Sequence, residues 1–314
     1  MAITSDETAP QRPDTPPLDD GRQVRRIVLA ASLLYVLFDL TLPLVHVPLH
    51  KPRSSAQALG YFLALLVVPT AVFMFLQIWL ARCLVALRLS VKGASLALAG
   101  SLVLWIVVMF TLRGSRTYPL LEDIAIHLWR AALLGLFETI TLAFAGYLLA
   151  RIVREPNVLL PVAIVAMPID YVGAMTSVGF THTIEKHHPS MVAAVSVPVP
   201  HVGGLSPIAF IGPGDALFMA FFFAVVLNLR LNERATFVWM TVLLTLTMLY
   251  ELLPISIPVA ALVPMGFAVI IANWNRFSLK RSEVFAMLYA ALMLFALVGA
   301  FYVASHHFLL RRMP

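Results

Sequence analysis

Two aspartates that lie within long apolar stretches are the residues of this sequence best placed to do chemistry. Asp170 and Asp215 each interrupt a hydrophobic run, and a carboxylate at bilayer depth is costly enough to need a reason. Two carboxyl groups within hydrogen-bond reach cannot easily both ionise, so one of them keeps a proton. The ionised carboxylate can take a proton from water while the protonated one polarises a carbonyl. This pair therefore suits amide hydrolysis with no metal and no covalent intermediate.

Helix-breaking residues surround both aspartates. Pro161 and Pro168 precede Asp170, and a proline inside a helix frees backbone groups and bends the helix. A second group of glycines and prolines precedes Asp215: Gly203, Gly204, Pro207, Gly212, Pro213 and Gly214. Irregular backbone at membrane depth is tolerated only against protein or a water-filled cavity, and glycine lets another backbone approach closely. The sequence therefore predicts that water and an extended substrate reach Asp215.

The placement of the apolar runs puts the two carboxyl groups at a similar depth. The run 157–179 carries Asp170 about ten residues, or about 15 Å, from its outer end. The run 206–228 carries Asp215 roughly nine residues from its outer start. Because consecutive spans are antiparallel, two adjacent helices can set these side chains face to face.

The composition indicates that lipid is the solvent of this chain. Its 314 residues are 61% hydrophobic and only 12% charged, with a mean hydropathy of +0.90, whereas a water-soluble domain averages about 25% charged residues. The net charge of +6 is carried by Lys and Arg in the short gaps between apolar runs, where basic residues act as topology signals. We therefore expect a lipid bilayer as a partner and no nucleic acid.

An all-α polytopic bundle is the expected fold, because backbone polar groups in lipid must be paired within each helix. About nine spans of sufficient length follow one another, at about 27–47, 58–81, 93–112, 128–150, 157–179, 206–228, 236–252, 255–274 and 283–305. The seventh and eighth are separated only by the break at Glu251 and Pro254 and could form one kinked element. Residues 1–21 are polar and Pro-rich and are predicted to be a disordered tail.

The basic residues between the spans predict the orientation. Thirteen of them fall on the side of the amino terminus and seven on the opposite side. By the positive-inside rule the amino terminus is cytoplasmic and the carboxyl terminus lies outside, in a multi-pass protein of the cell membrane. The loop 180–205 then lies outside as well.

The remaining chemistry-bearing residues receive simpler interpretations. Asp39 and Glu138 are single acids on apolar helices, where polar groups often serve as interhelical partners, and Glu251 is interpreted as interfacial. Cys83 is the only cysteine, which rules out an intrachain disulfide and a Cys-based metal site. Four histidines share one outer loop, where they are expected to be solvated: His182, His187, His188 and His201. We expect no metal and no cofactor.

At the two aspartates the sequence resembles the presenilin and signal peptide peptidase family, the GxGD intramembrane aspartyl proteases. Gly212-Pro213-Gly214-Asp215 matches the second catalytic motif of that family. The first motif is Tyr-Asp, and here the order is Ile169-Asp170-Tyr171. The third is Pro-Ala-Leu near the start of a late helix. The stretch 253–260 occupies that region without a literal match, and either Pro254 or Pro258 could stand in for the motif.

The resemblance covers roughly residues 157–275 and implies a division of the chain. After the tail, residues 22–156 would form N-terminal transmembrane helices, 157–282 the presenilin-like catalytic helices and 283–314 an extra C-terminal helix and tail. The family places its aspartates in the sixth and seventh of nine helices, whereas the spans here place them in the fifth and sixth. The resemblance implies Asp170 and Asp215 as catalytic residues. The substrate side would be lined by Gly212, Gly214, Tyr171, Pro254 and Pro258.

The expected function is an endopeptidase that cleaves peptide bonds within transmembrane segments. By the direction of the first catalytic helix, similarity to signal peptide peptidases implies type II membrane proteins or remnant signal peptides as substrates, and an oligomer is possible. A proton-coupled transporter is the main alternative, because transporters also use intramembrane acids and broken helices; it predicts inverted repeats, which the sequence does not display. A catalytically inactive, presenilin-like membrane scaffold is the third interpretation.

Overall fold

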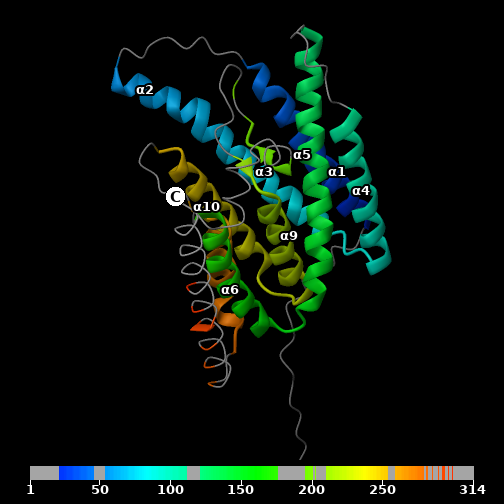
Figure 1. Ribbon diagram of the computed structural model, residues 1–314, viewed down its shortest axis with the longest axis vertical. Coiled ribbons are helices and arrows are strands. Elements are labelled where there is room, and N and C mark those ends of the chain that lie inside the picture. Colours follow the sequence, from blue (N-terminus) through cyan, green and yellow to red (C-terminus); the bar gives the residue numbers. More distant parts are fainter. Residues whose placement is uncertain are drawn as a thin grey trace, which may run out of the picture.

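The computed structural model describes residues 21–45, 54–111, 121–175, 195–200, 202, 210–253 and 259–278, with isolated positions between 281 and 299. Helices dominate these residues (Figure 1). In chain order they are α1 Gly21–Thr41, η1 Leu42–Leu44, α2 Ser55–Phe62, η2 Leu63–Val67, α3 Val68–Val85, α4 Val91–Thr111, α5 Leu121–Leu149, η3 Ala150–Ile152, α6 Pro156–Met175, α9 Pro213–Asn228, α10 Glu233–Glu251, α11 Leu262–Asn273 and η4 Trp274–Arg276.

Among the described residues, five helical segments are long and apolar enough to cross a membrane: Gly21–Leu44, Ser55–Val85, Val91–Phe110, Ala131–Ile152 and Pro156–Gly173. They coincide with the first five predicted spans. Their outward faces carry large apolar side chains such as Leu29, Leu96 and Ile152, which are 69%, 75% and 74% exposed. A water-soluble protein rarely exposes so much contiguous apolar surface. The expectation of a helical membrane protein is therefore supported, whereas a count of nine spans reaches beyond the described residues.

The later elements differ from the predicted spans. The sixth span was expected from residue 206, but α9 begins at Pro213 and has 16 residues. The seventh and eighth spans are two separate helices, because α10 ends at Glu251 and α11 begins only at Leu262. Most of the predicted ninth span, and all of the tail 1–21 except Gly21, lie outside the described residues.

Helix α9 lies at the centre of the bundle. It packs against α5 and α3 on one side and contacts α10 and α11 on the other. Its side chains are buried around most of its circumference, and Phe222, Phe223 and Val225 are completely buried. Gly146 of α5 makes the closest approach, because a Cβ at this position would collide with the backbone of α9 at Leu217 and Phe221. A helix that is apolar on all faces is expected to be surrounded by others.

Buried polar contacts connect the surrounding helices. The Gln77 side-chain amide on α3 donates to the Thr139 hydroxyl on α5 at 3.0 Å, and Asn273 on α11 donates to Thr236 on α10 at 3.0 Å. Arg82 of α3 pairs with Glu233 of α10 at 2.6 Å. Such interhelical polar pairs are the usual means by which membrane helices fix their neighbours.

A two-stranded antiparallel sheet leads into the central helix. Strand β1 is Val197–Pro198 and strand β2 is Phe210–Ile211, with Val197 opposite Ile211. β1 packs against α5, and the chain passes from β2 through Gly212 directly into α9. The sheet therefore fixes the start of α9 relative to α5.

Candidate active site

Asp215 lies in the first turn of α9, where it helps to cap the helix. Gly212 is the N-cap residue with an extended backbone, φ −70° and ψ 154°, and Pro213 occupies the first helical position. The Gly212 amide donates to Asp215 Oδ2 at 3.2 Å, which satisfies one of the amides that a helix start leaves unpaired. The side chain is partly buried. Asp215 thus lies at a helix start rather than deep within a span.

Asp170 lies on α6, two residues after Pro168. Its Oδ2 accepts a hydrogen bond of 2.9 Å from the backbone amide of Leu262, the first residue of α11. Like Asp215 it is partly buried. Each predicted catalytic carboxyl group is therefore held by a backbone amide at a helix start: Asp215 at the start of its own helix α9, and Asp170 at the start of α11.

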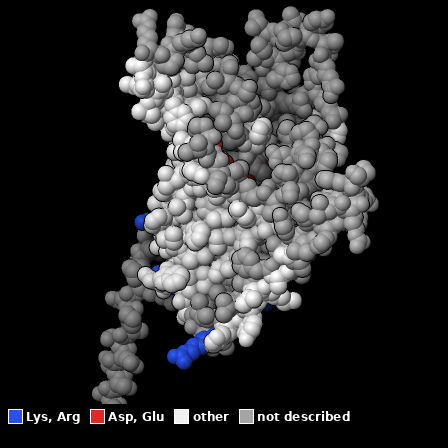
Figure 2. Space-filling model, turned by 60° about the vertical axis from the view of Figure 1, so that its left-hand side comes forward, with Lys and Arg blue, Asp and Glu red and all other residues white. Residues whose placement is uncertain are grey.

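The two aspartates and Glu251 form one group of acids. The carboxyl group of Asp215 interacts electrostatically with those of Asp170 and Glu251. Glu251, at the end of α10, accepts a 3.0 Å hydrogen bond from the amide of Val259. Figure 2 shows acidic side-chain atoms within a recess of the surface, while the basic side chains visible on this face lie nearer its lower end. The arrangement places three carboxyl groups from α6, α9 and α10 around one region.

The helices that carry Asp170 and Asp215 come together in a way that span order did not predict. We expected α6 and α9 to be packed directly against each other. Instead α6 packs mainly on α11, and α11 in turn packs on α10 and contacts α9. α11 therefore contacts both of the helices that carry the acids. This corrects the expectation of two adjacent antiparallel helices, and the face-to-face pairing of the two carboxyl groups stays a prediction.

The residues predicted to line the substrate side have different surroundings. A Cβ on Gly212 would stand 3.3 Å from Asp215 Oδ2, whereas a Cβ on Gly214 would meet nothing within 4 Å. Tyr171 is 50% exposed. Pro254 and Pro258 lie outside the described residues. Gly214 is thus the predicted residue with open space beside the acid.

Sequence reasoning missed the contributions of Glu251, Val259 and Leu262. Glu251 was interpreted as interfacial, and the third motif was sought at a proline, whereas Asp170 is bonded by a backbone amide four residues after Pro258. The available signal was the gap between α10 and α11, since an acid directly before such a break is well placed to bind the free amides that follow. Hydropathy alone does not reveal these contacts because they are made by main-chain atoms.

Asp39 and Glu138 belong to a different part of the bundle, between α1, α3 and α5. They are 9% and 3% exposed. Asp39 Oδ2 and the Tyr35 hydroxyl both lie within 4 Å of the point where a Cβ on Gly135 would stand. Tyr35 also interacts electrostatically with Glu138. Within the described residues neither the Tyr35 hydroxyl nor Glu138 Oε1 has a partner with hydrogen-bond geometry. These acids are buried at a helix interface, as expected of packing groups, and the acid group of α6, α9 and α10 does not include them.

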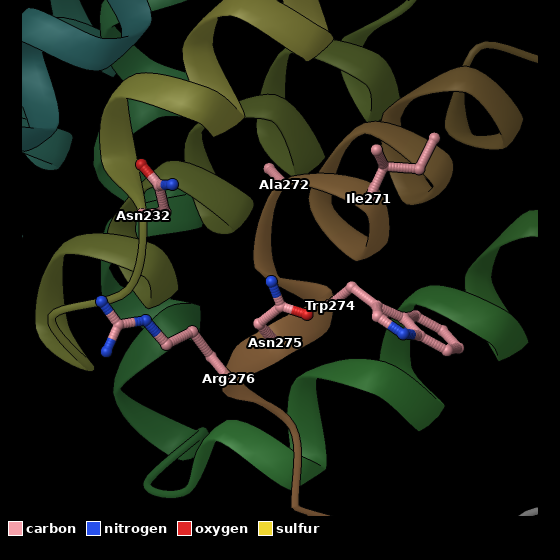
Figure 3. A pocket seen from close by; sticks show the side chains of 6 residues that line it. All are labelled: Asn232, Ile271, Ala272, Trp274, Asn275 and Arg276. Carbon is pink, nitrogen blue, oxygen red and sulfur yellow. The ribbon is translucent and has the colours of Figure 1, made fainter.

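A surface pocket of about 350 Å³ lies at the opposite end of α11. It is lined by Asn232, Ile271, Ala272, Trp274, Asn275 and Arg276 (Figure 3). In this view the Arg276 and Asn232 side chains lie on one side and the Trp274 ring extends to the other. None of the predicted site residues lines it. Because α11 has 12 residues, or about 18 Å of helix, this pocket is distant from Asp170.

Metal chemistry receives no support from the part of the chain that the structure describes. No group of three or more His, Cys, Asp or Glu residues there could hold an ion. The four loop histidines lie outside that part. Cys83 is buried on α3.

In the described part of the chain, the fold and the site define a largely helical protein with five helices suited to crossing a membrane and a group of carboxyl groups on α6, α9 and α10. No family model, curated protein or solved structure matches the chain. The resemblance to the GxGD proteases therefore rests on the motif residues of the sequence.

Proposed function

We propose that the protein is an intramembrane aspartyl protease in which Asp170 and Asp215 form the catalytic dyad. The observation that carries the proposal is the electrostatic interaction of these two carboxyl groups, each of which has one oxygen held by a backbone amide. Side chains fixed in this way lose little freedom when a reaction begins. Among the described residues no hydrogen bond occupies the other carboxyl oxygen of either aspartate. In the proposed mechanism that oxygen binds water or the scissile carbonyl.

In this mechanism one proton belongs to the pair and not to a single residue. The ionised carboxylate takes a proton from water as the water oxygen attacks the carbonyl carbon, and the protonated carboxyl gives its proton to the carbonyl oxygen. The resulting gem-diol collapses when the carbon–nitrogen bond breaks. The leaving nitrogen takes a proton from the pair, and a diol hydroxyl returns one, so that the dyad ends in its starting state.

The substrate is a transmembrane segment that unwinds locally, because its amides are otherwise bonded within its own helix. In the proposed mechanism the unwound backbone then takes new hydrogen-bond partners by adding to a strand edge near the dyad. The open space beside Gly214 supports close approach of a backbone to Asp215. Substrates with helix-weakening residues are therefore cleaved faster than Leu-rich ones.

The orientation proposed from the basic residues places the amino terminus in the cytoplasm and the dyad toward the outer face. By resemblance the substrates are type II membrane proteins or remnant signal peptides, and a proton-coupled transporter is the rival interpretation. The two interpretations differ in what the aspartates do, since a transporter moves an ion or solute and leaves the peptide bond intact.

The test is reconstitution of the wild type, Asp170→Ala and Asp215→Ala with a labelled transmembrane peptide. We expect cleavage by the wild type and a loss of at least about 10⁴-fold in either variant, because a dyad functions as a unit. Glu155→Ala, at an exposed acid before α6, is the matched control and should retain the wild-type rate. Cleavage that survives both aspartate changes rejects the dyad. If the wild type cleaves no peptide but drives uptake by an ion gradient, and both aspartate variants lose that uptake, the protein is a transporter.

A further inference from the structure

Glu251 binds a backbone amide beyond the end of α10. Its Oε1 accepts the amide hydrogen of Val259, eight residues further along the chain, at 3.0 Å. Glu251 is the last residue of α10 and is partly buried. A charged acceptor forms a stronger hydrogen bond to an amide than a neutral one does. This side chain therefore fixes the entry of the chain into the segment Val259–Leu262.

The segment Val259–Leu262 is held at both ends by acids. Glu251 of α10 binds the amide of Val259, and Asp170 of α6 binds the amide of Leu262 at 2.9 Å. Ala260 between them is 3% exposed, so the segment is also packed against protein. Because only three peptide units separate the two bonded amides, displacement of one end displaces the other.

Glu251 also acts on the dyad through its charge. Among the described residues, the carboxyl groups that interact electrostatically with Asp215 are Asp170 and Glu251. The interaction is strengthened by the apolar surroundings of α9, where the effective dielectric constant is well below that of water. Removal of one negative charge near a pair of acids favours ionisation of the pair.

We propose that Glu251 is a positioning residue of the same site, which holds the segment Val259–Leu262 against Asp170 and acts electrostatically on Asp215. We call the two hydrogen bonds from Val259 to Glu251 and from Leu262 to Asp170 the clamp. The effect of Glu251 on catalysis rests on the proposed protease function, whereas the clamp itself does not. Glu251 touches no reacting atom in this account. It sets where Asp170 lies and at which pH the dyad carries one proton.

Two substitutions separate the clamp from the charge. Glu251→Gln keeps an oxygen that can accept from the Val259 amide and removes the charge. Glu251→Ala removes both. Glu155→Gln and Glu155→Ala are the matched controls, since Glu155 is an exposed acid that directly precedes α6, 15 residues or about 22 Å of helix before Asp170.

The first measurement needs no catalysis. Hydrogen–deuterium exchange of a peptide covering residues 256–263, which begins upstream of Val259, reports the amides of Val259 and Leu262 in the full-length protein. Glu251→Ala should raise exchange at both amides, roughly tenfold or more. Glu251→Gln should leave it near the wild-type rate. Equal exchange in wild type and Glu251→Ala overturns the clamp.

The second measurement is peptide cleavage as a function of pH. Glu251→Ala should lower kcat by roughly ten- to a hundredfold with a smaller change in KM, as expected when a catalytic group is displaced. Glu251→Gln should keep most of the wild-type kcat and move the acid side of the pH profile to lower pH by roughly half a unit to one unit, because the dyad then ionises more readily. An unmoved profile overturns the electrostatic role, and a wild-type kcat in Glu251→Ala overturns the positioning role. If the wild type cleaves no peptide, the protease proposal fails, and the exchange result alone decides the clamp.

Discussion

At the scale of single residues, the two glycines of the GxGD-like motif have different physical roles. Gly212 is the N-cap of α9, with an extended backbone that any residue can adopt, and its missing side chain leaves room for the carboxyl group of Asp215. Gly214 adjoins open space. Gly212 therefore leaves room for the Asp215 carboxyl group, and Gly214 leaves room for a substrate backbone to approach it.

Substitution by alanine should separate these two roles. In Gly212→Ala the new Cβ would lie 3.3 Å from Asp215 Oδ2, so we expect kcat to fall roughly tenfold through displacement of the carboxyl group. Gly214→Ala meets no protein atom and should mainly raise KM by crowding the substrate backbone. Steady-state cleavage kinetics distinguish the two. A common effect of both changes on kcat alone would contradict the assignment.

At the scale of elements, the interface between α5 and α9 depends on a close backbone approach. A Cβ on Gly146 would collide with the Leu217 carbonyl oxygen and would lie 2.8 Å from the Phe221 nitrogen. Backbone atoms of a central helix cannot move as a flexible side chain can. The position of Asp215 therefore depends on a glycine on a neighbouring helix, more than 60 residues away in sequence.

Gly146→Ala should destabilise the protein, although alanine is the better helix former. Overpacking of this kind costs about 1–3 kcal/mol. Gly100→Ala on α4 is the matched change, because a Cβ there meets nothing within 4 Å, and it should stabilise by up to about 1 kcal/mol. Thermal unfolding in detergent measures both. Equal shifts of the melting temperature in the same direction for both variants would show that the close approach of α5 to α9 at Gly146 does not restrict the size of this residue.

The sequence predicted some elements well because their signal is local. Length and hydropathy suffice for α1 to α6, and the aspartates could be selected by their cost in lipid. The start of α9 was predicted too early, although glycine at the N-cap and proline at the first helical position were readable signs at Gly212 and Pro213. The contact of Asp170 with Leu262 could not be predicted, because it depends on which helices are lateral neighbours and hydropathy reports only depth. The contact of Glu251 with Val259 is local, and the break after Glu251 was the sign of it that went unused.

At the scale of the whole molecule, the two ends of α11 face different environments. Its first residue binds Asp170, and its last turn borders the pocket of Asn232, Asn275 and Arg276. With the proposed orientation the acid end faces outward and the pocket end faces the cytoplasm. The proposed function and orientation together then place a wet site near the outer face, with the apolar bundle between it and the cytoplasmic pocket.

Thiol labelling from each side of a sealed vesicle tests this arrangement. In a background with Cys83→Ala, a Gly214→Cys protein should react with a membrane-impermeant maleimide added on the outer side, because position 214 is exposed and lies beside the acids. Asn275→Cys, also at an exposed position, should react only from the cytoplasmic side. Labelling of each position from the opposite side would reverse the proposed topology, and labelling of both from one side would contradict it. If neither Gly214→Cys nor Asp215→Cys reacts from either side, the reagent finds no aqueous route to the acids, which contradicts the wet site that hydrolysis at Asp170 and Asp215 needs.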